Sequence, residues 1–146
     1  MNLEIFADRL SDLIFDSKKS VTEVANEMGI NKSTLYEYLL RERIPRLSSI
    51  VKIADYFNCS TDFLLGLEDE ISGLVFKECK PFPEQFKEIL SYFNISRYRL
   101  QKMTGLAESV LFYWSKGQKT PTLESVLLVC EKLDCRVDFF IGRSDI

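Results

Sequence analysis

Histidine is absent from the sequence, and glycine and proline are scarce. Without histidine the chain lacks the most common general acid or base and the usual partner of a serine or cysteine nucleophile. Six glycines and four prolines leave no room for a low-complexity or collagen-like segment. The sequence also has no glycine-rich phosphate loop and no cluster of carboxylates at metal-ligand spacing. None of these features favours an enzyme.

Zinc-binding spacings are missing among the cysteines. No two of them form a Cys-x-x-Cys pair, and no histidine is available to complete a ligand set. We therefore expect four reduced, mostly buried cysteines, and neither a bound metal nor a cofactor. The four are Cys59, Cys79, Cys130 and Cys135.

Long hydrophobic runs are missing too, since none reaches the roughly 18 residues that a membrane span needs. The N-terminal residues MNLEIFAD are acidic, whereas a secretory signal peptide begins with a basic region. With 46% hydrophobic and 28% charged residues, the composition is that of a globular protein. We expect a cytoplasmic protein without a membrane partner.

Positive charge is in short supply overall, but it is unevenly distributed. The net charge is −3, whereas nucleic-acid-binding proteins usually carry a basic excess. Residues 1–73 contain 8 Lys/Arg and 13 Asp/Glu, a net charge of −5. Residues 74–146 contain 11 Lys/Arg and 9 Asp/Glu, a net charge of +2. The location of the charges is therefore more informative than their total.

The sequence does contain a repeat of itself after 76 residues. Between residues 20 and 66 the match runs without a gap, and it is mostly between apolar residues, glycines and prolines. The matched pairs are Ser20/Ser96, Val24/Leu100, Gly29/Gly105, Ile30/Leu106, Ser33/Ser109, Leu35/Leu111, Tyr38/Trp114, Pro45/Pro121, Leu47/Leu123, Ile53/Val129, Phe57/Leu133, Cys59/Cys135, Asp62/Asp138, Phe63/Phe139 and Gly66/Gly142. We interpret the chain as two copies of one small domain.

Each copy is predicted to be a run of short helices. In the first copy, apolar residues recur every three or four positions from Leu3 to Ile14, which predicts an amphipathic helix. Asp8, Asp12 and Asp16 lie off that apolar stripe.

Capping residues predict where the next two helices begin and end. Ser20 and Glu23 have the spacing of a capping box, so a second helix is expected to start directly after Ser20. Gly29 is expected to end it, because glycine accepts the left-handed conformation of a helix C-terminus at little cost. Asn31 is a suitable N-cap for a third helix over residues 32–40.

The remaining elements set the predicted domain boundaries. A proline precedes a fourth helix over residues 47–57, and a short fifth helix is expected over residues 61–65. Residues 68–81 combine acidic residues with a glycine and a proline, which predicts a linker. The two domains are then residues 1–67 and 82–146.

The segment VTEVANEMGINKSTLYEYLL has a small residue in its first helix, glycine in the turn, and a Ser/Thr-rich start to its second helix. A proline and the pattern L-x-x-I-x-x-I-A follow, and the two copies end alike, in CSTDFLLG and CRVDFFIG. In these features the chain resembles the phage-repressor (Cro/Xre-type) helix-turn-helix family, over about 63 residues of the first copy and about 60 of the second. The residues that carry the resemblance are Ala25, Gly29, Ile30, Lys32, Ser33, Thr34, Leu35, Tyr38, Pro45, Leu47, Ile50, Ile53 and Ala54.

The resemblance implies an all-α fold of two tandem five-helix lambda-repressor-like helix-turn-helix domains. In such a domain one helix enters the major groove of double-stranded DNA, and the preceding helix crosses the phosphate backbone. The implied function is that of a sequence-specific transcriptional regulator, most simply a repressor, with recognition helices over residues 32–40 and 108–116. Either both copies read DNA within one chain, or one copy reads and the other pairs two chains as a homodimer.

The two copies depart from the family in different places. The first has Arg41 where glycine is common, so we expect its recognition helix to end differently from that of the second copy, which has Gly117. The second copy has Ala107 where the first has the capping Asn31, a change that costs about 1 kcal/mol. Glu108 then starts its recognition helix and would face phosphates unfavourably unless it accepts from a cytosine amino group.

The resemblance assigns two kinds of DNA contact by position. Lys32 would bond guanine O6 and N7, Glu37 would accept from cytosine N4, and Tyr36 would make an apolar contact. The residues expected at base edges are Lys32, Ser33, Tyr36, Glu37, Glu108, Ser109 and Tyr113, with Phe112 beside them. Those expected near phosphates are Thr22, Asn31, Arg43, Arg46, Arg97, Arg99, Lys116 and Lys119.

Several of these residues have a second interpretation. Lys32 and Glu37 are also residues that an ordinary solvated helix carries. Phe112 and Tyr113 equally suit packing against the other domain or against a second chain. Trp114 is expected in the core rather than at DNA.

A protein-interaction module, antitoxin-like or anti-repressor-like, is the alternative function for the same fold. The negative first half and the apolar, acidic recognition face of the second copy favour it. The chain has no third domain that would hold an obvious ligand pocket, so no small-molecule ligand is expected.

Overall fold

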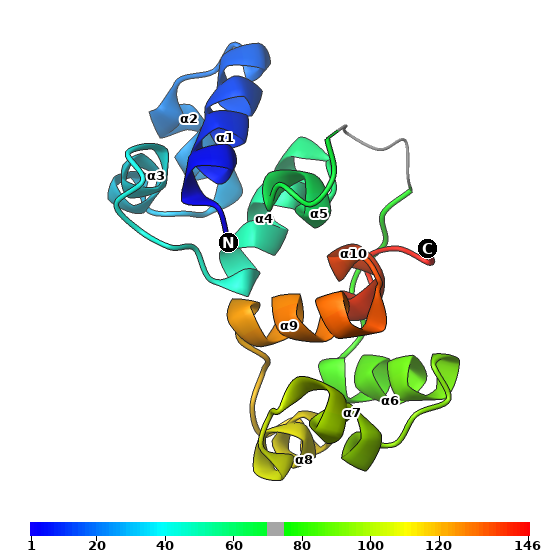
Figure 1. Ribbon diagram of the computed structural model, residues 1–146. Helices are drawn as coiled ribbons and strands as arrows, with labels where there is room; N and C mark the ends of the chain where they lie inside the picture. Colours follow the sequence, from blue (N-terminus) through cyan, green and yellow to red (C-terminus); the bar gives the residue numbers. More distant parts are fainter. Residues whose placement is uncertain (70–74) are drawn as a thin grey trace. The chain divides into compact units, whose positions relative to one another are not determined.

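The computed structural model describes residues 1–69 and 75–146, and over that part of the chain it is all-α, with ten helices and no strand (Figure 1). This confirms the expected fold class. The chain divides into two compact units, Met1–Gly73 and Leu74–Ile146, and each is described by itself. No helix among the described residues is long and apolar enough to cross a membrane.

The first unit consists of five helices joined by short turns. They are α1 (Leu3–Ser17), α2 (Val21–Met28), α3 (Lys32–Leu39), α4 (Leu47–Phe57) and α5 (Thr61–Leu64). Helix α1 packs against α3 and α5, α2 packs against α3 and α4, and α4 packs against α5. The apolar faces of the five helices therefore meet in one small core.

Capping interactions start and end α2 and α3 at the predicted residues. The Ser20 hydroxyl accepts from the Glu23 N–H at 3.1 Å, and the Glu23 carboxylate accepts from the Ser20 N–H at 3.3 Å, which completes the capping box. Gly29 ends α2 with a φ of 77°. Asn31 Oδ1 accepts from the Ser33 N–H at 2.9 Å and so caps α3.

The core of the first unit fixes which face of α3 points outward. Leu35 is fully buried, and Tyr38 is nearly so, with its ring edge-on to Phe6 at a centroid distance of 5.8 Å. Burying each such side chain is worth about 1.5–3 kcal/mol, so these two residues hold the helix in one rotational setting. Lys32, Ser33 and Tyr36 are left exposed.

The second unit has the same order and pairing of helices as the first. Its helices are α6 (Phe82–Tyr92), α7 (Arg97–Thr104), α8 (Glu108–Lys116), α9 (Leu123–Leu133) and α10 (Val137–Ile141). Helix α6 packs against α8 and α10, α7 packs against α8 and α9, and α9 packs against α10. These pairings correspond one for one to those of α1 to α5.

The backbone also turns at equivalent places in the two units. In the described part of the chain, every residue with a positive φ has an equivalent 76 residues away that also has a positive φ. The pairs are Lys18/Asn94, Gly29/Gly105, Arg41/Gly117, Asn58/Asp134 and Gly66/Gly142. The repeat read from side chains in the sequence is thus present in the backbone conformation as well.

The pair Arg41/Gly117 corrects one expectation about how α3 ends. Arg41 has a φ of 62° and Gly117 a φ of 72°, so the arginine adopts the same left-handed conformation as the glycine. The N–H of Arg41 bonds to the Tyr38 carbonyl, as the N–H of Gly117 bonds to that of Trp114. The expectation of a different ending holds for the last helical residue, Leu39 in α3 and Lys116 in α8, but not for the turn that follows. The left-handed conformation of Arg41 costs roughly 1 kcal/mol for a residue with a Cβ.

The core of the second unit is richer in aromatic residues. Trp114 is buried, as expected, and the rings of Phe82 and Phe86 lie edge-on to it at 5.7 Å and 5.5 Å. Such edge-to-face pairs add about 0.5–1.5 kcal/mol to the gain from burial alone. Trp114 therefore joins α8 firmly to α6.

A buried ion pair fastens the C-terminal end of the second unit. Arg143 Nη1 lies 2.6 Å from Asp138 Oδ1, and both side chains are almost completely buried. The Arg143 guanidinium also lies 4.3 Å from the centre of the Phe76 ring. The Lys77 N–H donates to the Arg143 carbonyl at 2.9 Å, so the segment that leads into α6 is bound to the end of the chain.

The described residues at both ends of the predicted linker 68–81 are bonded to their own units. Arg9 Nη1 donates to the Glu68 carbonyl at 2.7 Å, and Lys77 bonds to Arg143 as above. Residues 70–74 of that linker lie outside the described residues.

The cysteines are less buried than expected. Cys59 and Cys130 are buried, Cys135 is half-buried and Cys79 is exposed. Cys79 lies in the segment before α6.

Candidate nucleic-acid interface

The N-terminal half of α3 presents three exposed side chains next to one another. Lys32, Ser33 and Tyr36 project from the face opposite Leu35, and Tyr36 is 42% exposed. The Lys32 ammonium lies 5.9 Å from the centre of the Tyr36 ring, at the outer limit of a cation–π contact. This face offers a cation, a hydroxyl and a flat aromatic surface.

Two of the predicted contact residues are already engaged in the helix cap. Asn31 Oδ1 accepts from both the N–H and the hydroxyl of Ser33, at 2.9 Å and 2.7 Å. The cap holds both side chains at the first turn of α3. Because it uses Oδ1, it leaves the Asn31 amide NH₂ group as the donor for a partner.

Glu37 and Arg43, predicted for different roles, form an ion pair with each other. Glu37 is half-buried and Arg43 is exposed. The pair joins α3 to the loop that follows it. For Glu37 to accept from a base and Arg43 to donate to a phosphate, this exposed pair has to open, at a cost of no more than about 1 kcal/mol.

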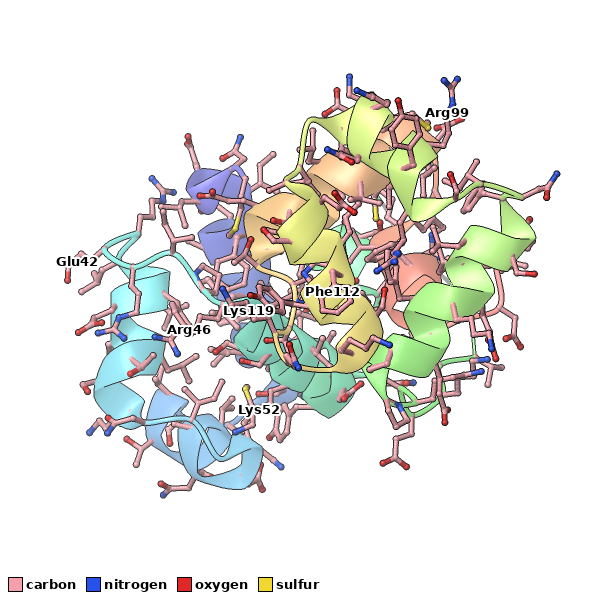
Figure 2. The ribbon with its side chains drawn as sticks, turned by 90° about the horizontal axis from the view of Figure 1, so that it is seen from below. Glu42, Arg46, Lys52, Arg99, Phe112 and Lys119 are labelled. Atoms are coloured by element: carbon pink, nitrogen blue, oxygen red, sulfur yellow. The ribbon has the colours of Figure 1, made fainter. Side chains whose placement is uncertain are left out.

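Thr22 and Arg46 lie at helix starts, as their predicted phosphate contacts require. Thr22 is exposed in the first turn of α2, and Arg46 is the exposed residue before α4. Figure 2 shows Glu42, which was not predicted as a site residue, extending outward from the loop between α3 and α4. An acidic side chain there opposes a phosphate contact by its neighbours.

Lys52 is a basic residue of this region that the sequence did not single out. It lies on α4, and its ammonium donates to the carbonyl of Gly29 in the turn between α2 and α3 at 3.3 Å. The bond brings a positive charge from α4 to the turn between α2 and α3. No local sequence pattern predicts this placement, because the two residues meet only through the packing of α2 on α4.

Asp8, on α1, lies close to the end of α3. Its carboxylate is 2.9 Å from Arg41 Nη2, in the turn that ends α3. Both side chains are largely exposed, so the pair contributes little stability. It does neutralise one of the acidic charges of α1 near α3.

In the second unit, the equivalent helix starts without a side-chain cap. Ala107 precedes α8 and makes no capping hydrogen bond, while Glu108 and Ser109 are exposed in the first turn. Phe112 is 41% exposed, and Tyr113 is half-buried. The outward face of α8 is therefore acidic at its start and aromatic further along.

The predicted phosphate contacts of the second unit surround those aromatic rings. Arg97 and Lys116 lie 5.6 Å and 5.7 Å from the centre of the Phe112 ring, and the Lys119 ammonium lies 5.0 Å from that of Tyr113. Arg99 extends outward from α7 instead (Figure 2). The structure thus brings three of the four basic residues to α8 and leaves the fourth apart.

In the first unit, the shifted pKa values belong to residues that were not predicted to contact DNA. The hydrogen bond from Lys19 holds the pKa of Glu27 on α2 below its usual range, and a bond from the Tyr56 hydroxyl adds to the effect. The same contacts raise the pKa values of Lys19 and Tyr56. These groups tie α2 to α4 on a partly exposed surface.

Comparison with known proteins gives one match. Residues 17–64 match the family model for a helix-turn-helix, a span that includes α2 to α5. Searches of curated proteins and of solved structures found no significant match to the chain. The match covers the exposed face of α3 and its predicted contact residues, and it supports the helix-turn-helix family for this segment. The first unit therefore contains a helix-turn-helix segment, with α2 and α3 as its paired helices.

Proposed function

We propose that the protein is a sequence-specific DNA-binding transcriptional repressor, and that α3 is its principal recognition helix. The observation that carries this proposal is the exposed face of α3, held outward by the burial of Leu35 and Tyr38. The major groove of B-DNA admits one α-helix, and the first residues of a recognition helix are those that reach base edges. Lys32, Ser33 and Tyr36 occupy those positions.

Each of these side chains has a chemical role at a base edge. Lys32 donates to O6 and N7 of a guanine, and the Ser33 hydroxyl, whose proton is bonded to Asn31, accepts from a base amino group. Tyr36 packs its ring against a thymine methyl group. Glu37 accepts from a cytosine amino group once its pair with Arg43 has opened.

The basic and polar residues around α3 set its register on the phosphates. Thr22, Arg43 and Arg46 take this role, together with the amide group of Asn31. Lys52 joins them because its ammonium already lies at the turn before α3. These contacts supply affinity that depends on salt, whereas the face of α3 supplies the choice of sequence.

The second unit is proposed as a second copy of the same fold, with α8 in the place of α3. The equivalent helix pairings and left-handed residues support this assignment. Glu108, Ser109 and Tyr113 would lie at base edges, and Arg97, Arg99, Lys116 and Lys119 near phosphates. A single small domain binds DNA weakly, so two DNA-binding domains about 34 Å apart are the usual arrangement. Two copies in one chain or two chains in a dimer would both provide them.

A selection from a random pool of DNA tests this function. The whole protein is incubated with the pool at about 50 mM and about 200 mM salt, and the retained DNA is sequenced. We expect one motif to be enriched at both salt concentrations, with two related half-sites if two DNA-binding domains bind together. Recovery of no motif at either salt would overturn the proposal.

A protein-interaction module with little DNA readout is the second candidate. The specific observation in its favour is the start of α8, where an uncapped helix presents the carboxylate of Glu108. The net charge of −5 on residues 1–73 also lowers attraction to phosphates. A stable complex with a protein partner, together with an empty DNA selection, would favour this candidate.

A further inference from the structure

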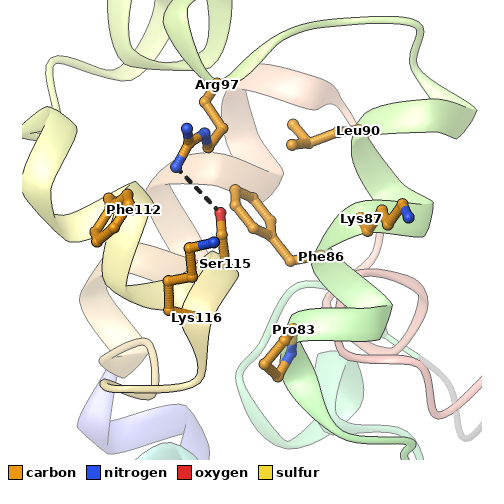
Figure 3. A pocket seen from close by; sticks show the side chains of 8 residues that line it. All are labelled: Pro83, Phe86, Lys87, Leu90, Arg97, Phe112, Ser115 and Lys116. Atoms are coloured by element: carbon orange, nitrogen blue, oxygen red, sulfur yellow. Dashed lines mark hydrogen bonds between the residues drawn. The ribbon is translucent and has the colours of Figure 1, made fainter.

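The second unit contains a hollow that the sequence did not predict. It has a volume of about 440 Å³ and lies between α6, the start of α7 and α8 (Figure 3). Apolar side chains of Pro83, Phe86, Leu90 and Phe112 form much of its wall. Ligand sites in proteins have volumes of about 300–1,000 Å³ and this kind of lining.

Positively charged side chains complete the wall of this hollow. Lys87, Arg97 and Lys116 line it, and no carboxylate does. Figure 3 shows Arg97 from α7 and Lys116 from α8 both extending toward Ser115, whose hydroxyl accepts from Arg97 Nη1 at 3.5 Å. In the part of the chain that the structure describes, none of the three cations forms an ion pair. The hollow therefore carries uncompensated positive charge over an apolar floor.

The first unit shows that the fold does not need these charges. Seventy-six residues earlier, the positions of Lys87, Arg97 and Lys116 are occupied by neutral residues. Those residues are Ser11, Val21 and Leu40. A position that only had to support α6, α7 and α8 would be served by such residues. The fold of the unit therefore does not account for the three cations.

Phe112 adds an aromatic wall between two of the cations. The guanidinium of Arg97 lies 5.6 Å and the ammonium of Lys116 5.7 Å from the centre of its ring. A flat ring that stacks on the exposed ring of Phe112 would place an attached anionic group within reach of both cations. The charge of the ligand would then face the cations, and its ring would face the apolar lining of the hollow.

We propose that this hollow binds a small organic anion, consisting of a flat aromatic ring that carries a carboxylate, sulfonate or phosphate group. The ring contacts Phe112, which is 41% exposed, and the anionic group binds Arg97 and Lys116. This proposal departs from the expectation, drawn from the sequence, that the protein binds no small molecule. The proposal does not rest on DNA binding by the second unit, because the ligand contacts are complete within the hollow.

Binding there would act directly on α8. Phe112 and Lys116 belong to the proposed recognition helix of the second unit, and a ligand would cover the ring of Phe112 and neutralise Lys116. The ligand would therefore compete with any phosphate contact that Arg97 and Lys116 make.

Two matched probes test the site by two-dimensional NMR of the whole ¹⁵N-labelled protein. Naphthalene-2-carboxylate has the ring and the charge, and naphthalene-2-carboxamide has the same ring without the charge. We expect the carboxylate to shift the amide signals of Phe86, Phe112 and Ser115 in a saturable manner. Its affinity should exceed that of the carboxamide by about fivefold or more, the effect of one partly solvated ion pair.

Lys116→Gln and Lys119→Gln are matched variants for this test. Lys116 ends α8 and Lys119 lies in the loop that follows, so each variant removes one positive charge from this region, but only Lys116 lines the hollow. Lys116→Gln should weaken binding of the carboxylate about fivefold, and Lys119→Gln should leave it unchanged. Equal affinity for the two probes, equal loss in the two variants, or no saturable shift up to about 10 mM would overturn the proposal. The DNA selection is a separate measurement, so either proposal can fail while the other stands.

Discussion

The starts of α3 and α8 depend on a single residue that differs between the units. Asn31 caps α3 through its side-chain oxygen, whereas Ala107 has no acceptor to offer at the start of α8. The first N–H groups of α8 are left to water. Glu108 in that first turn offsets part of the loss, because its negative charge lies at the positive end of the helix dipole.

Replacing Ala107 by asparagine should supply the missing cap and raise the free energy of unfolding of the second unit by about 1 kcal/mol. Urea unfolding followed by the fluorescence of Trp114 measures this change, because Trp114 is the only tryptophan and lies in that unit. Asn31→Ala is the matched control: it should destabilise the first unit by a similar amount. An unchanged urea midpoint for Ala107→Asn would show that the absence of a side-chain cap does not lower the stability of the second unit.

The left-handed backbone conformation of Arg41 destabilises the first unit, and one substitution can remove this strain. Its φ of 62° is unfavourable for a residue with a Cβ, and its ion pair with Asp8 is exposed. Arg41→Gly should therefore stabilise the first unit by about 1 kcal/mol, less a few tenths for the lost pair. Slower hydrogen exchange of the buried Leu35 amide would register the gain. Faster exchange would mean that the pair with Asp8 outweighs the strain.

At the scale of elements, α2 is tied to α4 by the three charged or polar groups of Lys19, Glu27 and Tyr56. The Lys19 ammonium lies 2.9 Å and 2.8 Å from the two Glu27 oxygens, and the Tyr56 hydroxyl donates to the same carboxylate. The pKa of Glu27 is lower in the folded protein than its ordinary value. Its stabilising effect is therefore full above the ordinary glutamate pKa and is lost as the pH falls through the lowered value.

This sign leads to a prediction for acid conditions. In the wild type, the free energy of unfolding should fall as the pH drops below the ordinary pKa of glutamate, and Glu27→Gln should make that fall shallower. Carboxyl NMR signals followed against pH should place the pKa of Glu27 below its usual range. In Tyr56→Phe that pKa should rise toward the ordinary value, because one hydrogen bond is removed. A pKa of Glu27 that is unchanged in Tyr56→Phe would contradict the described contact.

The buried pair of Arg143 and Asp138 should be the most sensitive polar contact of the second unit. Arg143→Ala leaves the Asp138 carboxylate buried with less compensation, which typically costs about 3 kcal/mol or more. The fluorescence of Trp114 in urea again measures the unfolding of the second unit. Asp145→Asn breaks the exposed pair with Lys77 and serves as the control, with an expected change below about 0.5 kcal/mol. Similar effects of the two variants would mean that burial adds nothing to the pair.

Local sequence patterns predicted most of the elements but few of the contacts between them. The helix starts after Ser20 and Asn31 and the end of α2 at Gly29 follow from one or a few neighbouring residues, and all three were predicted. The bond from Lys52 to Gly29 and the hollow beside Phe112 depend on packing between helices. Residues that meet only in the folded unit leave no periodicity in the sequence, so these features could not be predicted.

At the scale of the whole molecule, the two units share one arrangement of helices but differ in the features that they expose. The first unit has the capped helix, the exposed Lys32, Ser33 and Tyr36, and the family match over residues 17–64. The second has the uncapped helix and the positively charged hollow. The net charges of −5 and +2 follow the same division. We therefore propose that the first unit provides most of the DNA sequence specificity.

The most direct test of the central claim is the random-pool selection carried out in parallel on the wild type and on Lys32→Ala. Lys32 is exposed and forms no ion pair within the described residues, so the variant should fold normally. The account predicts an enriched motif for the wild type, and the same motif with relaxed preference at one guanine for Lys32→Ala, a loss of about 1–3 kcal/mol of discrimination at that position. A motif with unchanged preferences at every position in the variant would contradict reading by α3.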